Sequence, residues 1–534
     1  MSDANRVRLA VLKSPARNFP IDVNSEPLQT LRNTGQPNLA FEIERITSEE
    51  LRADRQTSDF IAVGATAGGS VPTELSAGNA DPFIESAVLW TFAQNDGLTA
   101  EETWTTGDVF TTDAQLDASG LTGSGAGFKA GHIVRVRHVD AGGTTIDGPY
   151  EVTANTAGVL ALTPIANVTQ SSRIANPALV ATTLGAPAAG TTSSVKVCGF
   201  IGGTGDIALT EDGTTVTLTG SAGQFDDLMD ATSGSEIDLR PGQIIKIAGF
   251  TGGQATAEGA NVYARVASRT GTTITFRQPD SIDSADAGAS TRAEIYFGDF
   301  LHNPGADDID AISEHQYLLE QAFLDHSPTA YQVFAGMAVQ NVTLTLQPRA
   351  IAQLALEFLG LNAAVGNTAD LGTLYTNRPG TPYSDPPANP VLNTSSNVGR
   401  LGLGGGNVSG GAQNFVLEAT VSIAANLQEL PAVGVFGAAA LSAGELGITG
   451  TLNTYFDDLS LYRQVLNDDE TSFDANIRGA DGRVFSVDIP RIKINGSPDV
   501  PGKNEQVVLN LTYQGLLDPV LGYSISFHRM EFAR

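Results

Sequence analysis

The stretch TGTLNTYFDDLSLYRQVLNDDETSFDANI covers residues 449–477 and decides how the rest of the chain is interpreted. It begins with the alternation of polar and apolar residues that is typical of a strand with one wet face. A short segment with helical character follows, and a second strand pattern comes after it. Acidic residues gather at both joints, so the stretch is either a chemical site or the turn region of a structural unit. These acids are Asp457, Asp458, Asp468, Asp469 and Glu470.

The acidic joints do not fit an EF-hand calcium loop, and a helix cap followed by a solvated turn is the favoured interpretation, with a cation site as the alternative. An EF-hand loop requires a glycine at its sixth position and a glutamate at its twelfth, and NDDETS has no glycine at the required place. Asp457 and Asp458 precede LSLYRQVL, where we expect them to cap the helix and complement its dipole. Asp468, Asp469 and Glu470 follow the helix, where carboxylates do not complement the dipole. We expect them to be solvated loop residues.

A similar series of segments occurs in the first half of the chain. GSVPTELSAGNADPFIESAVLWTF (69–92) has the same strand, acidic joint and helix, with Asp81 and Pro82 as helix-start signals. The order and spacing of the later strands also agree between the halves, with LALEFLGL matching LNLTYQGLL. The match is collinear only when residues 97–300 are removed. We infer two copies of one β-rich domain, the first with a large insertion; the alternative is two unrelated β domains with chance similarity.

The insertion contains a shorter repeat of its own. FKAGHIVRVRHV (128–139) resembles LRPGQIIKIAGF (239–250), and each is followed by a turn rich in Gly and Thr and by two more strand patterns. Each unit is interpreted as a small β-barrel or sandwich.

The fold class is therefore mainly β, with two sandwich or barrel domains, each flanked by a short helix, and inserted small β-barrel domains. The predicted layout is an extended arm at 1–40, for which a disordered tail is the alternative, a first domain at 41–96 and 301–362, inserted domains at 97–183 and 184–300, a long loop at 363–413 and a second domain at 414–534.

Composition and charge exclude several classes of function. The net charge is −29, so the chain repels nucleic-acid phosphates and anionic membranes. Cys198 is the only cysteine, which excludes an intramolecular disulfide and a thiolate cluster. The N-terminus lacks the apolar core of a signal peptide, and no run of about 18 apolar residues predicts a membrane span.

Motifs for catalysis or cofactors are absent or weak. The chain has no phosphate-binding loop, nucleophile elbow or HExxH, and its six histidines show no metal-ligand spacing. Residues 193–196 fit SxxK, but only as a short pattern in a Ser/Thr-rich segment. We therefore expect no enzyme activity, no cofactor and no metal site.

The strand patterns in both halves have one apolar and one polar face. The polar faces are rich in Thr, Asn and Glu and nearly free of Lys and Arg. They are either ordinary solvated surfaces or the wall of a channel through which a polyanion slides without sticking. The candidate channel-facing residues are Glu74, Thr343, Thr345, Glu357, Glu418, Thr449, Thr451, Asn453, Asn510 and Thr512.

Several blocks resemble the tail tube proteins of long-tailed bacteriophages (siphoviruses). ITSEELRADRQTSDFIAVGATAGGSVPTEL (46–75) is similar to the N-terminal signature of that family. ITGTLNTYFDDLSLYRQVL (448–466), VDIPRIKI (487–494) and QGLLDPVLGYSISFHRMEF (514–532) resemble its C-terminal part. The doubled insertion departs from the simplest members, which leaves its role open.

The resemblance implies a structural virion protein of the tail, assembled in the host cytoplasm. In that family six domains close into a ring, and rings stack into a tube that conducts viral dsDNA during ejection without binding it tightly. Two domains per chain then imply a homotrimer that forms a pseudo-hexameric ring with an acidic, polar lumen. The implied partners are other copies of the chain, the tape measure protein in the lumen, the tail terminator and the distal tail protein, with no membrane.

Two other classes of function compete with this expectation. A cell-surface or secreted adhesin of tandem β domains would be an elongated monomer with an export signal. A carbohydrate-active enzyme on a β scaffold would need paired carboxylates and aromatic platforms, and the chain has 2 Trp and no marked acid pair on its strands.

Overall fold

The computed structural model describes most of both halves and part of the insertion. The described residues are 6–13, 27–35, 37–92, 101–104, 110–111, 115–117, 128, 130–139, 145–156, 159–165, 188, 192–203, 205–220, 225, 239–249, 262–277, 288–289, 292–306, 312, 314–367, 383–386, 389–394, 398–403, 406–407, 416–457, 459–479, 481–500, 502–503 and 505–533.

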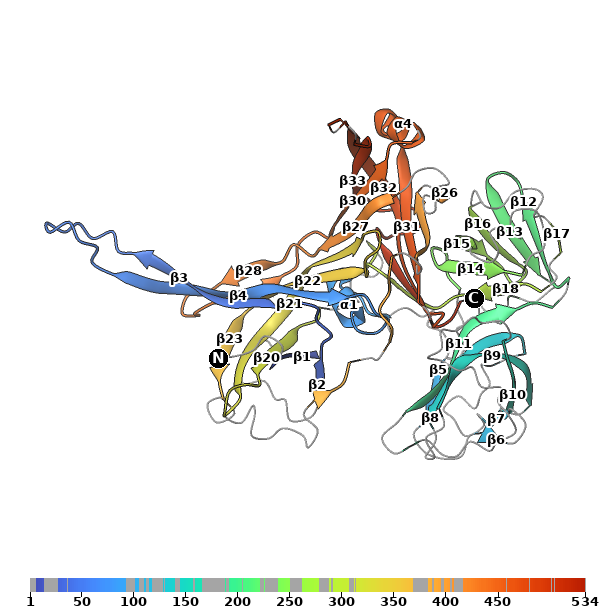
Figure 1. Cartoon of the computed structure of the whole chain (residues 1–534), viewed down its shortest axis with the longest axis horizontal. Helices are drawn as coiled ribbons and strands as arrows, with labels where there is room; N and C mark the ends of the chain where they lie inside the picture. Colours follow the sequence, from blue (N-terminus) through green and yellow to red (C-terminus); the bar gives the residue numbers. More distant parts are fainter. Residues whose placement is uncertain are drawn as a thin grey trace.

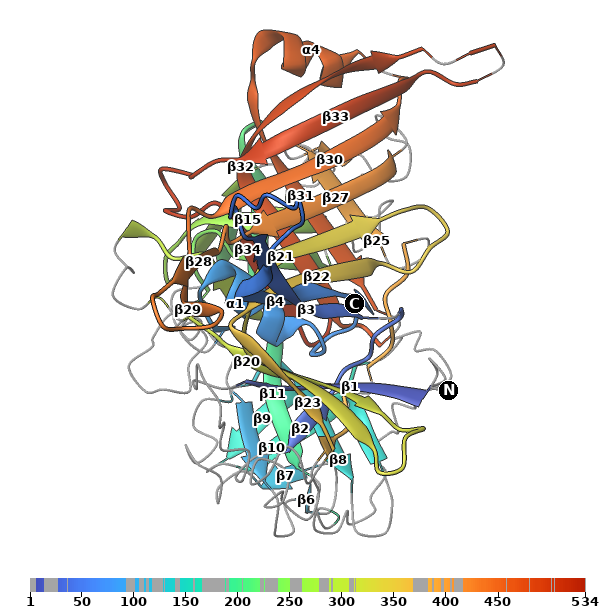
Figure 2. The same ribbon diagram turned by 90° about the vertical axis from the view of Figure 1, so that its left-hand side faces the viewer.

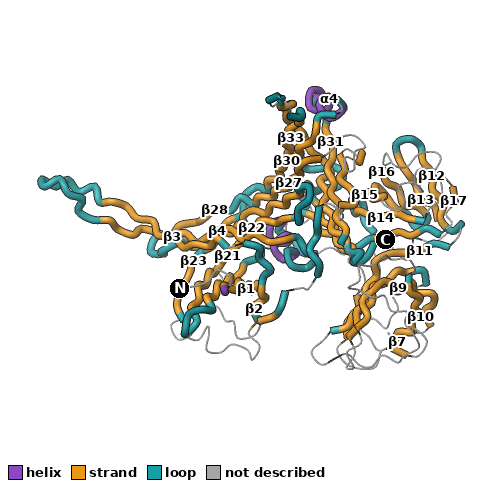
Figure 3. Tube along the Cα trace, viewed as in Figure 1, coloured by secondary structure: helices purple, strands orange, loops and turns teal. Residues whose placement is uncertain are grey.

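The protein is mainly β, as predicted (Figures 1 and 3). Its two α-helices within the described residues are α1 (Asp81–Val88) and α4 (Ser460–Asn467). The segment Tyr317–Phe323 is a strand.

Eight strands lie side by side in one continuous antiparallel sheet, called here the long sheet (Figure 2). Its strands in spatial order are β3 (Asn38–Thr47), β4 (Phe60–Glu74), β22 (Gln353–Gly360), β21 (Ala330–Leu346), β27 (Val416–Ala424), β30 (Gly447–Tyr455), β33 (Val508–Gly515) and β32 (Val484–Asp499).

Two of these strands are long enough to belong to a second layer as well. The first half of β21 pairs with β20 and β23, and the first half of β32 pairs with β31 and β34. Each of these two groups of paired strands forms a short outer sheet behind the long sheet. The outer strands of the first half are β1 (Val7–Lys13), β2 (Leu28–Thr30), β20 (Tyr317–Phe323), β23 (Asn362–Gly366) and β24 (Tyr383–Ser384). Those of the second are β25 (Val398–Leu403), β26 (Gly406–Asn407), β31 (Glu470–Arg478) and β34 (Ser526–Met530), with β19 (Asp299–His302) beside β34.

The two halves share the same strand order and pairing. The order β3–β4–β22–β21 repeats as β27–β30–β33–β32, and α1 follows β4 as α4 follows β30. In the outer sheets β1 pairs with β20 as β25 pairs with β31. The collinear segments found in the sequence therefore occupy matching places in the fold.

Two segments predicted to lie outside the β domains, an extended arm and a long loop, contribute strands to the outer sheets. The predicted N-terminal arm, 1–40, contains β1 and β2, and the predicted loop, 363–413, contains β24, β25 and β26. Leu9 and Val11 are buried opposite β20, and Leu401 and Leu403 are buried opposite β31. These parts of the two predictions are wrong, because short strands surrounded by polar linkers can gain their stability from burial beside a strand distant in sequence.

The main core lies between the long sheet and the outer layers. One cluster of buried apolar side chains runs from Leu9 to Phe527 and includes residues of both halves. α1 packs on this core through Phe83, whose ring centroid lies 5.6 Å from that of Phe358 in an edge-on contact. α4 buries only Leu461. The first helix is therefore a core element, whereas the second covers the surface of the sheet.

The helix starts differ from the capping prediction. The N-cap of α4 is Leu459 and makes no side-chain capping hydrogen bond; Asp457 lies outside the first turn, and Asp458 falls outside the described residues. The capping prediction for Asp457 is therefore wrong. Beyond the helix, Asp468 and Glu470 are ion-paired on the surface with Lys493 and Arg491 of β32.

The insertion forms a separate lobe built from two antiparallel units (Figure 1). The meander β8–β9–β10 matches the meander β14–β15–β16, as the internal repeat predicted. The strands are β5 (Glu101–Trp104), β6 (Phe110–Thr111), β7 (Gln115–Asp117), β8 (His132–Val139), β9 (Thr145–Thr156), β10 (Val159–Pro164), β11 (Ser193–Ile201), β12 (Ile207–Glu211), β13 (Thr215–Gly220), β14 (Ile244–Ala248), β15 (Val262–Arg269), β16 (Thr273–Arg277), β17 (Gly288–Ala289) and β18 (Glu294–Tyr296).

The insertion is anchored on the C-terminal end of the chain. A buried cluster joins Tyr263 and Tyr296 of the insertion to Met530 of β34 and to Phe532 just after it. Arg265 also forms an ion pair with the buried Asp488 of β32. The insertion thus interrupts the first half of the sequence but packs on the second half.

Two hairpins extend from the long sheet. The β3–β4 hairpin projects far from the rest of the chain (Figure 1) and exposes Leu51 and Phe60. The corresponding loop of the second half carries the small β28 (Gln428–Pro431) and β29 (Ala438–Ser442) hairpin.

Candidate functional site

All ten predicted channel-facing residues lie on the same face of the long sheet. Directly opposed residues in antiparallel strands share a face, and the register links the strands in rows. One row runs through Glu74, Gln353, Thr345, Thr420, Thr451, Thr512 and Asn495. A neighbouring row contains Thr343, Ser422, Thr449 and Gln514. Another contains Glu418, Asn453, Asn510 and Ser497, and Glu357 lies opposite Asn341. We call this surface the polar face.

The polar face is uniform in charge over its six central strands. β4, β22, β21, β27, β30 and β33 contain no Lys or Arg. Glu74, Glu357 and Glu418 are their carboxylates on this face, and the other polar side chains are neutral. A sheet of this composition attracts no anion to its surface and repels a polyanion at short range.

Hydrogen bonds between neighbouring strands hold the neutral side chains in place. Thr420 Oγ1 lies 2.9 Å from Thr451 Oγ1, and Thr343 Oγ1 lies 3.2 Å from Ser422 Oγ. The Asn453 amide donates to Glu418 Oε2 at 3.1 Å. Side chains that bond to one another present fewer free donors to a passing ligand.

The two halves of the chain meet within the polar face. β21 of the first half and β27 of the second form six consecutive residue pairs, from Asn341 opposite Ala424 to Leu346 opposite Ala419. The side chains continue across this junction, where the Ser422 hydroxyl donates to Asn341 Oδ1 at 2.9 Å. The face is thus one surface, although it is built from two repeats.

Pairing across strands adds residues that strand patterns alone did not select. Asn341, Gln353, Asn495 and Ser497 belong to the polar face. The signal for them is register, because their places follow only after the partner strand is known.

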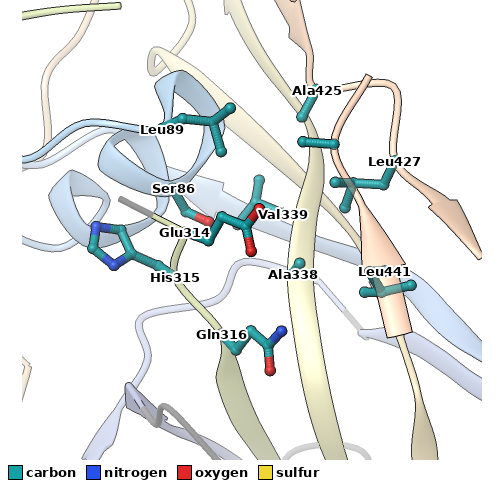
Figure 4. A pocket seen from close by; sticks show the side chains of 11 residues that line it. Ser86, Leu89, Glu314, His315, Gln316, Ala338, Val339, Ala425, Leu427 and Leu441 are labelled. Carbon is teal, nitrogen blue, oxygen red and sulfur yellow. The ribbon is translucent and has the colours of Figure 1, made fainter. Parts of the chain in front are cut away.

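A pocket beside the long sheet is lined by residues of α1, β21 and the segment before β20 (Figure 4). Ser86, Glu314 and His315 lie in its otherwise mostly apolar wall. The His315 ring points away from Glu314 in Figure 4, and its Nε2 lies 3.4 Å from Lys13 Nζ. Burial and the Lys13 charge lower the pKa of His315 to about 4. A nucleophile–base–acid arrangement needs these groups to contact one another in sequence, so this pocket does not supply one.

The weak SxxK pattern is structural. Lys196 Nζ lies 2.7 Å from Asp299 Oδ2, and Ser193 Oγ lies 2.8 Å from His138 Nδ1, with Ser193, His138 and Asp299 buried. Lys196 is thus held in an ion pair with Asp299.

No group of three or more His, Cys, Asp or Glu is arranged to hold a metal ion within the described residues. None of the helices in the described part of the chain is long and apolar enough to cross a membrane.

The chain is thus a mainly β protein whose two matching halves share one continuous sheet, and the six central strands of that sheet contain no Lys or Arg. The model of the phage tail tube protein family matches residues 5–515, so the chain belongs to that family. It is a structural component of the virion tail. Comparison with curated proteins finds no match.

Proposed function

We propose that three copies of the chain close into a pseudo-hexameric ring, and that stacked rings form a tail tube whose lumen is lined by the polar face. The junction between β21 and β27 carries this proposal, because it shows one repeat joined to the next through the long sheet. Three chains would supply six repeats, and ring closure would remove the exposed edges of the sheet.

The electrostatics of the polar face suit a conduit for double-stranded DNA. DNA carries one negative charge per about 1.7 Å of axis and binds proteins mainly through Lys and Arg. The six central strands supply neither residue. Repulsion from Glu74, Glu357 and Glu418 acts over roughly 8–10 Å at ordinary ionic strength, so DNA would slide through without adhering to the wall.

The other partners follow from a tube of finite length. Its lumen would hold the tape measure protein before ejection, and its two ends would contact the tail terminator and the distal tail protein. The chain would carry out no catalysis and need no cofactor.

The lumen assignment is tested by reversing charge in the virus. Phage carrying Glu74→Lys, Glu357→Lys and Glu418→Lys together should release DNA more slowly than wild type in a receptor-triggered ejection assay. The control carries Asp469→Lys, Glu445→Lys and Glu505→Lys, which make the same charge change at exposed positions outside the polar face. Tails of normal length with normal ejection kinetics in the first variant would refute the lumen assignment.

A further inference from the structure

We propose that residues 494–499 of β32 pair with β3 of a second copy of the chain, with Ser497 of one copy opposite Ala40 of the next. This inference rests on the proposed ring and adds the edges, the direction and the register of the contact that would close it.

The chain contains an internal template for the contact. β32 is the counterpart of β21, and β3 is the counterpart of β27. Inside the chain, the second half of β21 is paired on one side with β22 and on the other with β27. The same half of β32 is paired with β33 on one side. A further β3 is the strand that the repeat predicts on its other side.

Both edges are open in the described part of the chain. There β3 pairs only with β4, and residues 494–499 of β32 pair only with β33. An open strand edge is a template for a second chain. Because the two edges differ, the contact is head-to-tail, and such contacts close into rings when the rotation permits.

The register follows from matched positions in the two repeats. On the β32 side, Leu344 lies opposite Leu354, and Pro498 lies opposite Leu509, the residue that matches Leu354 in the collinear segments. Pro498 therefore corresponds to Leu344.

On the β3 side the matched positions are marked by glycines. Leu39 lies opposite Gly69, and Val421 lies opposite Gly450. A Cβ on Gly69 would meet Asn38 O at 1.8 Å, and one on Gly450 would meet Thr420 O at 2.1 Å. Both glycines thus allow the same close approach to the preceding strand, and Leu39 corresponds to Val421.

Leu344 pairs with Val421 inside the chain, so Pro498 should pair with Leu39 of the next copy. The full predicted register is Asn495 with Glu42, Gly496 with Phe41, Ser497 with Ala40, Pro498 with Leu39 and Asp499 with Asn38.

The side chains are compatible with this register. No two like charges lie directly opposite each other, a condition that favours cross-strand pairing. Phe41 is partly buried and would cover Gly496, which has no side chain of its own. Pro498 lacks a backbone donor, so its pair would have one hydrogen bond fewer. Proline also makes an edge strand less receptive to unrelated strands.

Backbone hydrogen bonding selects the best pair for cross-linking. Leu516 N–H donates to Arg491 O at 2.9 Å, and hydrogen-bonded pairs alternate along antiparallel strands. The backbone groups of Ser497 therefore point toward β33, and Ser497 and Ala40 would form a non-hydrogen-bonded pair. In such a pair the Cα atoms lie about 4.5 Å apart, which is within the range of a disulfide.

The experiment uses the full chain with Ala40→Cys and Ser497→Cys, oxidised after assembly and run on a non-reducing gel. The native Cys198 is buried and should not interfere. We expect covalent dimers and trimers, with no larger species. The control Ala40→Cys with Asn495→Cys shifts one partner by two residues and should give little cross-linking. A mixture of the two single variants should stop at dimers, and each single variant alone should give none.

Electron microscopy of the same samples separates the two claims. Rings or tubes without the Ala40–Ser497 cross-link would overturn the register while leaving the tube function intact. Cross-links within a single-variant sample would overturn the head-to-tail contact. A wild-type chain that stays monomeric in the same assembly conditions, together with cysteine variants that do not cross-link, would overturn both proposals.

Discussion

The Gln347 side-chain amide donates to Glu418 Oε1 at 2.8 Å, and this hydrogen bond joins the first repeat to the second across the polar face. Asn453 donates to the other carboxylate oxygen. Glu418 therefore accepts from neutral amides, and no cation neutralises it in these two contacts. Its negative charge stays on the face while its orientation is fixed.

The charge of Glu418 should matter little for folding. We expect Glu418→Gln to change the free energy of unfolding by less than about 0.5 kcal/mol, as surface substitutions usually do. Thermal unfolding monitored by circular dichroism measures this effect. A melting temperature several degrees lower would mean that the carboxylate serves stability, which would weaken its assignment to DNA passage.

The matched glycines should be intolerant of a side chain. Gly450→Ala would place a Cβ against Thr420 O and the Tyr513 ring, and Gly69→Ala adds a positive φ of 145°. Overpacking of this kind costs about 1–3 kcal/mol. Both variants should therefore melt at a lower temperature than wild type, and Gly69→Ala should have the lower melting temperature of the two. Gly502→Ala, which meets nothing within 4 Å, is the control. Equal melting temperatures for all three would contradict the close strand approach.

Arg529 of β34 should link α1 of the first half to the second half and, through Asp299, to Lys196 of the insertion. Its Nη1 lies 2.6 Å from Asp81 of α1, and its Nη2 lies 2.8 Å from Asp299 of β19. Asp81 and Asp299 are buried, and leaving a buried charge without its partner costs up to about 3–5 kcal/mol. We expect Arg529→Met to lower the melting temperature by several degrees and to increase protease cleavage near the insertion.

The matched control for Arg529 is Arg6→Met, which breaks the exposed pair with Asp325. Exposed pairs contribute about 0–1 kcal/mol, so its unfolding should resemble that of wild type. If Arg529→Met and Arg6→Met have the same melting temperature, the insertion is not anchored through Arg529.

His528 should make the protein less stable in acid. Burial, with the charges of Arg265 and His302, lowers its pKa to about 3; the ring accepts a hydrogen bond from Ile244 N–H at Nδ1. The unfolded chain binds a proton below pH about 6.5 and the folded chain does not. The stabilisation is thus complete above pH about 6.5 and falls by up to about 1.4 kcal/mol per pH unit toward pH 3.

The pH dependence of the melting temperature measures this effect. His528→Gln should lower stability at pH 7, because the ring also stacks on Phe300 with 5.0 Å between centroids. Its melting temperature should nevertheless depend less on pH between 6.5 and 4. An unchanged pH slope would show that His528 does not titrate on unfolding.

Local patterns in the sequence predicted much of the fold. Alternation in segments such as 342–347 predicted the polar and buried sides of the strands, and the collinear repeats predicted matched strand orders. The predictions that failed concern segments whose structure depends on long-range contacts. β1 and β25 gain their place from partners that are distant in sequence, and Asp457 is set apart from α4 by where the helix begins.

The candidate site was predictable as a set of polar residues but not as one surface. Thr345 and Thr420 are each recognisable as polar positions, yet only their pairing shows that the two repeats share a face. Register between strands leaves no local mark in either strand, which is also why Asn495 and Ser497, opposite Thr512 and Asn510 of β33, were missed.

Cryo-electron microscopy of assembled tubes tests the central claim most directly. The account predicts an inner wall formed by β4, β22, β21, β27, β30 and β33, with Thr451 nearer the tube axis than Leu452, and the insertion farther from the axis than the long sheet. A map in which Leu452 and α1 point toward the axis while Thr451 faces outward would contradict it.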